Sequence, residues 1–214
     1  MTDSIIRERY AVMAPRVVNA LEHRGYEAWF CPSFAEAKAR VLELLLPGET
    51  VSWGGSMTME AIGVLSALRG GNYSLIDRDT AETPEERREL MRQSLLCGTF
   101  LSSVNAMTED GEMVNIDGNC NRIAAIAFGP KRIVLAVGMN KICRDLPSAL
   151  ARARSFAAPA NSVRLKLDRL PCVKTGVCCD CRSGESICSQ VVIMRCNHIP
   201  DRIKVVLIGE DCGL

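Results

Sequence analysis

Residues 50–76 read TVSWGGSMTMEAIGVLSALRGGNYSLI, and this stretch decides the fold class. Thr50–Trp53 is a short run of residues that favour extended structure, and it predicts a strand. A glycine-containing loop follows, and apolar residues then recur at helical spacing as far as Leu68. After a Gly-Gly break, Tyr73–Ile76 predicts the next strand. A strand, a helix and a strand in this order are typical of a unit with parallel strands.

The same alternation continues on both sides of this stretch. We expect helices at residues 4–24, 33–46, 83–96, 121–128 and 146–157, and strands at 26–30, 99–103, 132–137, 191–194 and 203–208. A hairpin with an Asp-Gly turn is expected to join residues 106–108 to 113–115. This pattern predicts an α/β protein in which helices cover both faces of a parallel sheet, and we expect the last two strands to return to that sheet.

Six of the eleven cysteines lie in a short stretch near the carboxyl end of the sequence. Four of them, Cys172, Cys178, Cys181 and Cys188, have a spacing that allows four thiolates to close around one metal centre, because a C-x2-C turn points both sulfurs inward. Zinc ribbons usually have two such turns and this chain has one, so the spacing favours a [4Fe-4S] cluster over zinc. Cys179 would then be a spare thiol. Non-ligand cysteines, or a redox-labile pair at Cys178 and Cys181, are the alternative.

No internal repeat or low-complexity linker interrupts the sequence. We therefore expect residues 1–214 to form a single domain, with residues 171–190 as a cysteine-rich, metal-binding insertion before the last strands. Outside this insertion, Cys196 and Cys212 lie near predicted strands and are expected to pack as small apolar groups.

The loop after the strand Thr50–Trp53 is the first candidate for ligand binding. Gly54 and Gly55 let the backbone approach a ligand, and Ser56 or Thr58 can add a hydroxyl to the N–H groups at the start of the next helix. Loops at the carboxyl ends of parallel strands are where open α/β sheets bind ligands. The alternative is a tight turn in which a residue of this loop caps the helix.

A second polar cluster precedes the predicted helix 121–128. Arg122 can hold a carboxylate or phosphate, with Asp117 or Glu109 as acid, base or orienting group. The alternative is a turn in which Asn121 caps the helix. With Asn140 and Lys141 after a buried strand, these residues form a polar rim that predicts an anion-binding pocket. The predicted ligand-binding set is Gly54, Gly55, Ser56, Thr58, Asp117, Gly118, Asn121, Arg122, Asn140 and Lys141.

Composition excludes several classes of protein. The net charge of +1 and the 5% aromatic content give no attraction to nucleic acid, and no basic stripe with aromatics is present. No apolar run approaches the ~20 residues that cross a bilayer, and no signal peptide is recognisable. We therefore expect a cytoplasmic protein whose cysteines serve metal binding or catalysis rather than disulfides.

Short motifs along nearly the whole chain resemble the LUD (lactate-utilisation) domain family, in particular its small stand-alone members with a cysteine-rich carboxyl-terminal segment. The matching residues are Trp53-Gly-Gly-Ser-Met-Thr58, Glu109-Asp-Gly111, Asn115-Ile-Asp-Gly118, Asn121-Arg122, Phe128-Gly-Pro-Lys131, Gly138-Met-Asn-Lys141, Ala158-Pro159, Pro171-Cys172, Thr175-Gly176, Cys178, Asp180-Cys181, Ile187-Cys188 and Gly209-Glu-Asp211.

The resemblance implies a three-layer αβα fold similar to the sugar-phosphate isomerase and CoA-transferase superfamily. Some larger relatives belong to an iron–sulfur system that is associated with the oxidation of L-lactate to pyruvate. This chain lacks the ferredoxin-like cysteine runs of those systems, and it carries cysteine at Cys120 and Cys179, where family members often have another residue.

Three functions fit these observations. The first is a LUD-family protein that binds a small anionic metabolite and a four-cysteine iron–sulfur site, in redox metabolism linked to lactate or another 2-hydroxy acid, with a redox partner protein. The second is an enzyme of the isomerase or acyl-transferase type with structural zinc, and the third is a non-catalytic subunit that senses a metabolite. The sequence predicts neither the substrate nor the reaction, and homo-oligomerisation stays open.

Overall fold

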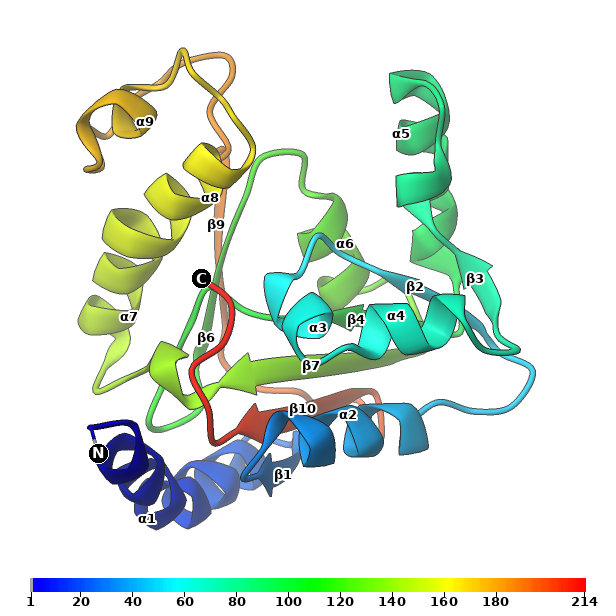
Figure 1. Cartoon of the computed structure of the whole chain (residues 1–214), viewed down its shortest axis with the longest axis vertical. Coiled ribbons are helices and arrows are strands. Elements are labelled where there is room, and N and C mark those ends of the chain that lie inside the picture. Colours follow the sequence, from blue (N-terminus) through cyan, green and yellow to red (C-terminus); the bar gives the residue numbers. More distant parts are fainter. Residues whose placement is uncertain (1) are drawn as a thin grey trace.

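The computed structural model describes residues 2–214, and its centre is a parallel sheet of six strands (Figure 1). All neighbouring strands in this sheet run in the same direction. In spatial order they are β1 (Glu27–Cys31), β10 (Ile203–Ile208), β7 (Arg132–Gly138), β4 (Thr99–Ser102), β2 (Thr50–Trp53) and β3 (Ser74–Ile76).

Helices cover both faces of this sheet, because its central strands are apolar on both sides. On β7, Ile133, Leu135 and Val137 pack with α1 (Thr2–His23) and α6 (Asn121–Ala127). Val134 and Ala136 pack in the opposite core, with α2 (Phe34–Glu43), α3 (Met57–Ala61) and α4 (Val64–Arg69). The predicted three-layer αβα architecture is confirmed.

A second, four-stranded sheet stands beside the first. Its strand order is β8 (Ile142–Cys143), β5 (Ala106–Thr108), β6 (Met113–Asp117) and β9 (Gln190–Met194). The predicted hairpin is the β5–β6 pair, and Gly111 in its turn has a φ of 91°. α7 (Leu146–Arg152) and α8 (Ala158–Arg164), joined by a π-helical turn at Ala153–Ala157, pack against this sheet.

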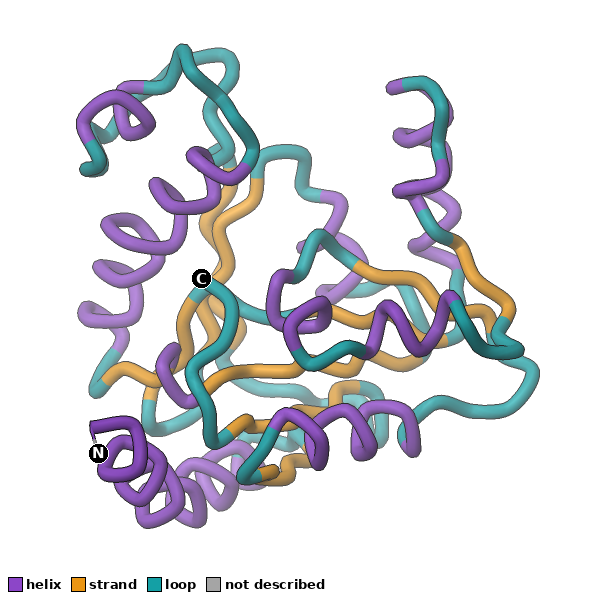
Figure 2. The backbone as a smooth tube through the Cα atoms, viewed as in Figure 1, coloured by secondary structure: helices purple, strands orange, loops and turns teal. Residues whose placement is uncertain are grey.

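The prediction that both last strands return to the main sheet is right for β10 and wrong for β9. All six residues of β10 are buried, as a central strand of a covered parallel sheet requires. β9 is largely exposed and instead pairs antiparallel with β6 at the edge of the second sheet. The tube in Figure 2 shows β9 rising beside β6, away from the six-stranded sheet.

Several helices begin or end at residues other than those predicted. The helix expected to reach Leu68 breaks into α3 and α4 at Gly63, whose φ is 73°. The helix that Ser33 caps ends at Glu43, and the helix expected at 146–157 continues to Arg164. The remaining helices are α5 (Pro84–Gln93), α9 (Pro171–Thr175) and the 3-10 turns η1 (Arg78–Thr80), η2 (Ser94–Leu96) and η3 (Met139–Lys141). No helix in residues 2–214 is long and apolar enough to span a membrane.

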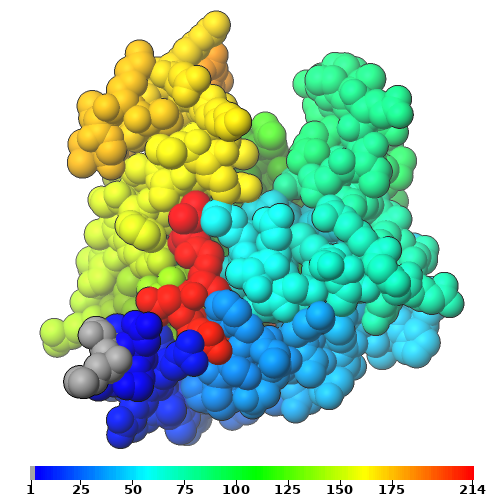
Figure 3. Space-filling view, viewed as in Figure 1, coloured from blue at the N-terminus to red at the C-terminus, as the bar shows by residue number. Residues whose placement is uncertain are grey.

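Two arms rise on one side of the six-stranded sheet. One arm is α5 with η1; the other is α8, α9 and the cysteine-rich segment (Figure 1). The space-filling view shows the surface hollowed between them (Figure 3), and a pocket of about 580 Å³ is lined by residues of both arms.

Candidate functional site

The pocket between the arms contains most of the residues that the sequence predicts for ligand binding. β2, β4 and β7 are parallel, so the segments that follow them meet at the same edge of the sheet. Of the predicted set, the pocket lining includes Gly55, Ser56, Thr58, Asp117, Gly118, Asn121, Arg122 and Lys141.

Three predicted residues do not line this pocket. Gly54 lies beneath it, where a Cβ atom would meet the Arg122 side chain at 3.4 Å. The Asn140 Oδ1 atom accepts a hydrogen bond from the Cys212 N–H at 3.2 Å, which turns this side chain toward the backbone after β10. Glu109 lies at the β5–β6 turn and pairs with Arg16 of α1 at 3.4 Å, so its carboxylate is held outside the site.

Gly55 lies beneath two guanidinium groups that come from opposite arms. A Cβ atom on Gly55 would be 2.5 Å from the Arg78 Nη2 atom and 3.8 Å from the Arg164 Nη2 atom. The side chain of Arg78 is 13% exposed, and its Nε–H has no hydrogen-bond partner among the described residues. Burial lowers the pKa of Arg78, and the nearby Arg87 and Arg164 act in the same direction, against Asp79 and Asp117. We call Arg78 and Arg164 the arginine pair.

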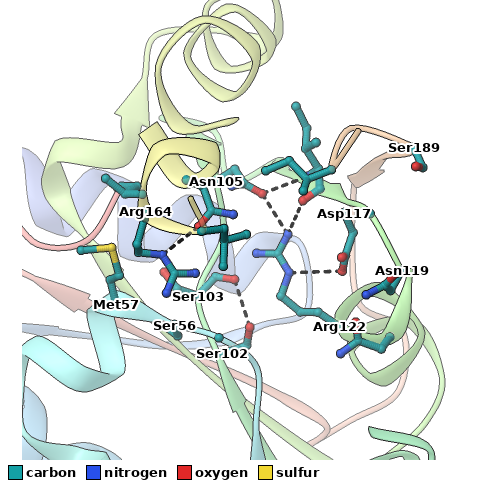
Figure 4. Close-up of a pocket in the computed structure, with 18 of the residues that line it drawn as sticks. Ser56, Met57, Ser102, Ser103, Asn105, Asp117, Asn119, Arg122, Arg164 and Ser189 are labelled. Atoms are coloured by element: carbon teal, nitrogen blue, oxygen red, sulfur yellow. Dashed lines mark hydrogen bonds and ion pairs between the residues drawn. The ribbon is translucent and has the colours of Figure 1, made fainter. Parts of the chain in front are cut away.

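Arg122 has a fixed position at the base of the pocket (Figure 4). Its Nη2 atom donates to the Asn105 side-chain oxygen at 3.0 Å and to the Ile116 carbonyl at 2.6 Å. Its Nε atom lies 3.5 Å from an Asp117 carboxylate oxygen, which also accepts the Ile123 N–H at 3.3 Å. Three acceptors already occupy this guanidinium, so its role is to position the loop around Asp117 as well as to supply charge.

The sequence left two helix-capping alternatives open, one for the loop after β2 and one for Asn121, and the structure confirms only the first. Ser56 caps α3, because its Oγ atom accepts the Met59 N–H at 3.2 Å. Asn121 is not a helix cap: Cys120 occupies that position with a φ of 60° and makes no side-chain capping bond. Asn121 is the first residue of α6 and lines the pocket.

Lys141 is the most unusual ionisable group of the site. Its side chain is buried, and its Nζ atom donates to the Thr58 hydroxyl at 3.0 Å, the Ser103 hydroxyl at 3.1 Å and the Val104 carbonyl at 3.3 Å. Burial lowers the pKa of Lys141 to about 7, because these neutral oxygens do not replace the hydration of an ammonium ion. An amine that is half unprotonated near neutral pH can act as a base or a nucleophile.

The pocket is also lined by the arginine pair, Ser103 and Asn105, which are not in the set predicted from the sequence. Arg78 and Ser103 follow β3 and β4, so the rule that identified the loop after β2 applies to them too. Arg164 lies on α8, at the edge of the second arm, and no motif marks it. Its place in the site depends on how that arm packs.

The four predicted metal ligands are neighbours in the second arm. Partial burial raises the pKa of the Cys188 thiol, and the thiols of Cys178, Cys181 and Cys172 raise it further, while a hydrogen bond with Ser186 opposes them. Within residues 2–214, no three His, Cys, Asp or Glu side chains are grouped closely enough to hold a metal ion. The donor set fits a thiolate-bound metal by its chemistry, and the metal site stays a prediction.

The other cysteines divide by burial. Cys212 is buried, as expected for a small apolar group, whereas Cys196 is exposed after β9 and does not pack as predicted. Burial raises the pKa of Cys212 to about 11, and Lys141 and Thr58 oppose that rise, which places this thiol beside the buried amine.

Comparison with known proteins gives a family and a fold. The family model described as LUD domain matches residues 14–208. No curated protein matches the chain. Among solved structures, this chain is similar to a DUF162 family protein from Deinococcus radiodurans, with a TM-score of 0.55 and 12% sequence identity; the match covers 92% of this chain and 97% of the Deinococcus protein.

A weaker likeness is to ribose 5-phosphate isomerase A from Neisseria gonorrhoeae. It covers 53% of each chain, with a TM-score of 0.36 and 13% identity. The Deinococcus radiodurans protein therefore supports the fold of the whole chain, and the pocket must supply the argument about function.

Proposed function

The chain belongs to the LUD domain family, and from that premise we propose that it binds a small anionic metabolite in the pocket between the two arms. We also propose that a [4Fe-4S] cluster on the cysteine-rich segment serves redox chemistry linked to lactate or another 2-hydroxy acid. The arginine pair carries the first proposal, and the number and spacing of the four cysteines support the second.

The arginine pair brings two positive charges together above Gly55. Two guanidinium groups that approach each other repel, and the Nε–H of the partly buried Arg78 has no hydrogen-bond partner among the described residues, with an Asp79 carboxylate oxygen 3.9 Å away. A carboxylate or phosphate between them relieves both costs, because it accepts hydrogen bonds from guanidinium groups in a bidentate geometry. Gly55 leaves the space that the Arg78 guanidinium occupies, which lets this group lie close to the backbone of the loop.

The pocket fits a metabolite better than a macromolecule. Its volume of about 580 Å³ is within the range of small-molecule sites. The polar side chains Ser103, Asn121 and Asn161 also line it and can recognise hydroxyl or carbonyl groups. A 2-hydroxy acid or a sugar phosphate has both an anionic group and such oxygens.

The cysteine-rich segment borders the same pocket, because Ser186 and Ile187 are part of its lining. Cys172, Cys178, Cys181 and Cys188 would hold the cluster, which would supply one-electron transfer. The Cys179 sulfur lies 3.5 Å from the Val177 carbonyl and 3.7 Å from the Thr175 hydroxyl, so it has a local partner of its own. A redox partner protein and a cytoplasmic location belong to this proposal.

Ligand binding is tested by thermal shift with L-lactate, sugar phosphates and CoA esters. We expect one anionic class to raise the melting temperature of the wild type and to lose at least ~10-fold in affinity in Arg78→Ala and Arg164→Ala, as expected for charge-assisted hydrogen bonds. Arg92→Ala is the matched control, because Arg92 is an exposed arginine on α5 that pairs only locally with Glu89. Equal affinity in all three variants would rule out the arginine pair as the anion site.

The cluster is tested by anoxic purification with iron, sulfide and zinc analysis and absorbance spectroscopy. We expect a brown protein with a broad band near ~400 nm, typical of thiolate-bound iron–sulfur clusters. Cys178→Ser should lose the band and Cys179→Ser should keep it. A colourless protein that contains stoichiometric zinc would contradict the iron–sulfur proposal and support the structural-zinc enzyme instead.

A further inference from the structure

Lys141 lies where three parts of the chain meet. It ends η3, the turn after β7, and its amine contacts the first turn of α3 and the residues after β4. A Cβ atom on Gly213 would lie 2.9 Å from the Nζ atom, so the backbone after β10 covers the amine on another side. Lys141 nonetheless lines the pocket.

No carboxylate is among the hydrogen-bond acceptors that the structure gives this amine. The charged and titratable groups that face it are Cys212 after β10, Arg152 of α7 and Arg122 of α6. Burial is the main cause that lowers the pKa of Lys141 to about 7; the two arginines act in the same direction, and only Cys212 opposes them.

A comparison within the chain shows that this environment is specific to Lys141. Lys204 is also buried, but its ammonium group forms an ion pair with Glu27 at the edge of the sheet. Lys204 is thus compensated like a structural lysine, whereas Lys141 faces hydroxyl groups and a cavity. A buried ammonium ion without a counterion costs stability, and groups with strongly perturbed pKa values cluster at functional sites.

The arginine pair and the Lys141 amine belong to neighbouring parts of the pocket lining. The pair lies above Gly55, and the amine bonds to Thr58, three positions later in the same loop and helix start. One small molecule can therefore place an anionic group on the arginines and a second functional group on the amine.

We propose that Lys141 is the reacting amine of this pocket and forms an imine with a small aldehyde or ketone that carries a carboxylate or phosphate. This inference rests on the proposed anion binding and names the substrate class of the same site. The second candidate function, an enzyme without redox chemistry, gains support from it, because imine formation needs no electron carrier.

The step balances without an added reactant. The Nζ lone pair attacks the carbonyl carbon and forms a C–N bond, while the electron pair of the C=O bond moves to oxygen. Two protons leave nitrogen in the course of the reaction and the carbonyl oxygen departs as water, which leaves a C=N bond. The Thr58 hydroxyl donates to Ser103 at 3.3 Å and contacts the amine, so these two hydroxyls can relay the protons.

The test is reductive trapping followed by peptide mass spectrometry. Wild-type protein is incubated with glyoxylate, pyruvate or glyceraldehyde 3-phosphate, with and without cyanoborohydride. We expect one of them to label Lys141 at least ~10-fold more than any other lysine, because about half of its amine is unprotonated near neutral pH, whereas a lysine with the ordinary pKa of ~10.4 is almost fully protonated. Buried Lys204 and exposed Lys166 in the same digest are internal references. Equal labelling of Lys141 and Lys166 would overturn the proposal.

Two further experiments distinguish imine formation from anion binding itself. Arg164→Ala should reduce trapping of the anionic carbonyl compound by more than it reduces trapping of uncharged acetaldehyde, whereas the control variant Arg92→Ala should leave both unchanged. If the aldehyde or ketone compounds raise the melting temperature in an Arg164-dependent manner but none of them labels Lys141, the imine is overturned and anion binding stays intact. If none of the three carbonyl compounds, L-lactate, the sugar phosphates or the CoA esters binds, both proposals fail.

Discussion

At the scale of single residues, two glycines shape the candidate site because they have no side chain. Gly55 makes room for the arginine pair, and Gly213 lets the backbone lie against Thr58 and Lys141. A Cβ atom on Gly213 would be 2.3 Å from the Thr58 hydroxyl, closer than real atoms approach, and its φ is 66°. Any side chain at this position must therefore displace the hydrogen bonds of the buried amine.

We predict that Gly213→Ala lowers the free energy of unfolding by more than Gly48→Ala. Both glycines have a positive φ, so alanine is strained at each by about 1–2 kcal/mol. Gly48 has open space around its Cβ position, whereas Gly213 adds the clash with Thr58. Urea unfolding of both variants measures the difference. Equal destabilisation would show that the backbone after β10 is not held against Thr58.

The sequence allowed prediction of the pocket residues that belong to recognisable loops. Thr58, Asp117 and Lys141 follow strands or precede helices, and such positions can be identified from the chain alone. Gly54 and Asn140 occupy the same loops but face other partners, because side-chain direction depends on tertiary packing. The low pKa of Lys141 depends on burial by Gly213 and Val104, which no local motif encodes.

At the scale of elements, the cysteine-rich segment differs from the rest of the chain. Apart from the five-residue α9, it forms no regular structure before β9, and most of its residues are exposed. Arg154 of the π-helical turn pairs with Asp180, and Arg169 pairs with Glu185 at 2.9 Å, but such exposed ion pairs contribute little stability. A metal centre would supply the order that packing does not provide.

We predict that metal loading protects this segment from trypsin. Lys174 and Arg182 are exposed cleavage sites that flank Cys178 and Cys181. Cleavage there should slow by at least ~10-fold in the anoxically loaded protein, because the four ligands would tie both sites to one centre. Cleavage at Arg88, on exposed α5, is the control within the same digest. Equal cleavage rates with and without metal would contradict a four-cysteine metal site in this segment.

Most helices and strands could be predicted because local signals agree with the fold. Ser33 and Thr83 each accept the N–H of the glutamate three positions later, as their capping sequences predict. The break at Gly63 could not be placed, because an isolated glycine in a helical pattern is often tolerated. The sheet that β9 joins could not be predicted either, since five extended residues do not specify their partner strand.

At the scale of the whole molecule, the two arms connect the anion pocket to the cysteine-rich segment. Arg78 approaches from one arm and Arg164 from the other, while Ser186 and Ile187 of the cysteine-rich segment close a further side of the pocket. A Cβ atom on Gly118 would lie 3.1 Å from the Ile187 backbone, so the loop that carries Asp117 packs directly on this segment. Metal binding by the four cysteines would therefore alter the shape of the ligand site.

The free energy of unfolding of the whole protein should depend on the protonation of Lys141. Below pH 7 the lysine is protonated in both the folded and the unfolded chain, and the full cost of the buried charge is present. Between about pH 7 and its ordinary pKa of ~10.4, the unfolded chain binds more protons than the folded one, so stability rises with pH. Above ~8.5 the buried thiols oppose this trend, because the pKa of Cys97 is raised to about 12 and that of Cys212 to about 11.

We therefore predict that the free energy of unfolding of the wild type rises between pH 7 and ~8.5 relative to Lys141→Met, by at most about 1.4 kcal/mol per pH unit. The variant keeps a chain of similar length and removes only the titrating amine. Urea unfolding of both reduced proteins at matched pH values measures the difference, and the titrating groups that do not interact with Lys141 cancel between them. A difference that stays flat from pH 6 to 8.5 would mean that Lys141 keeps its proton in the folded protein, and an ammonium ion with three oxygen acceptors would then be a structural group that cannot attack a carbonyl carbon.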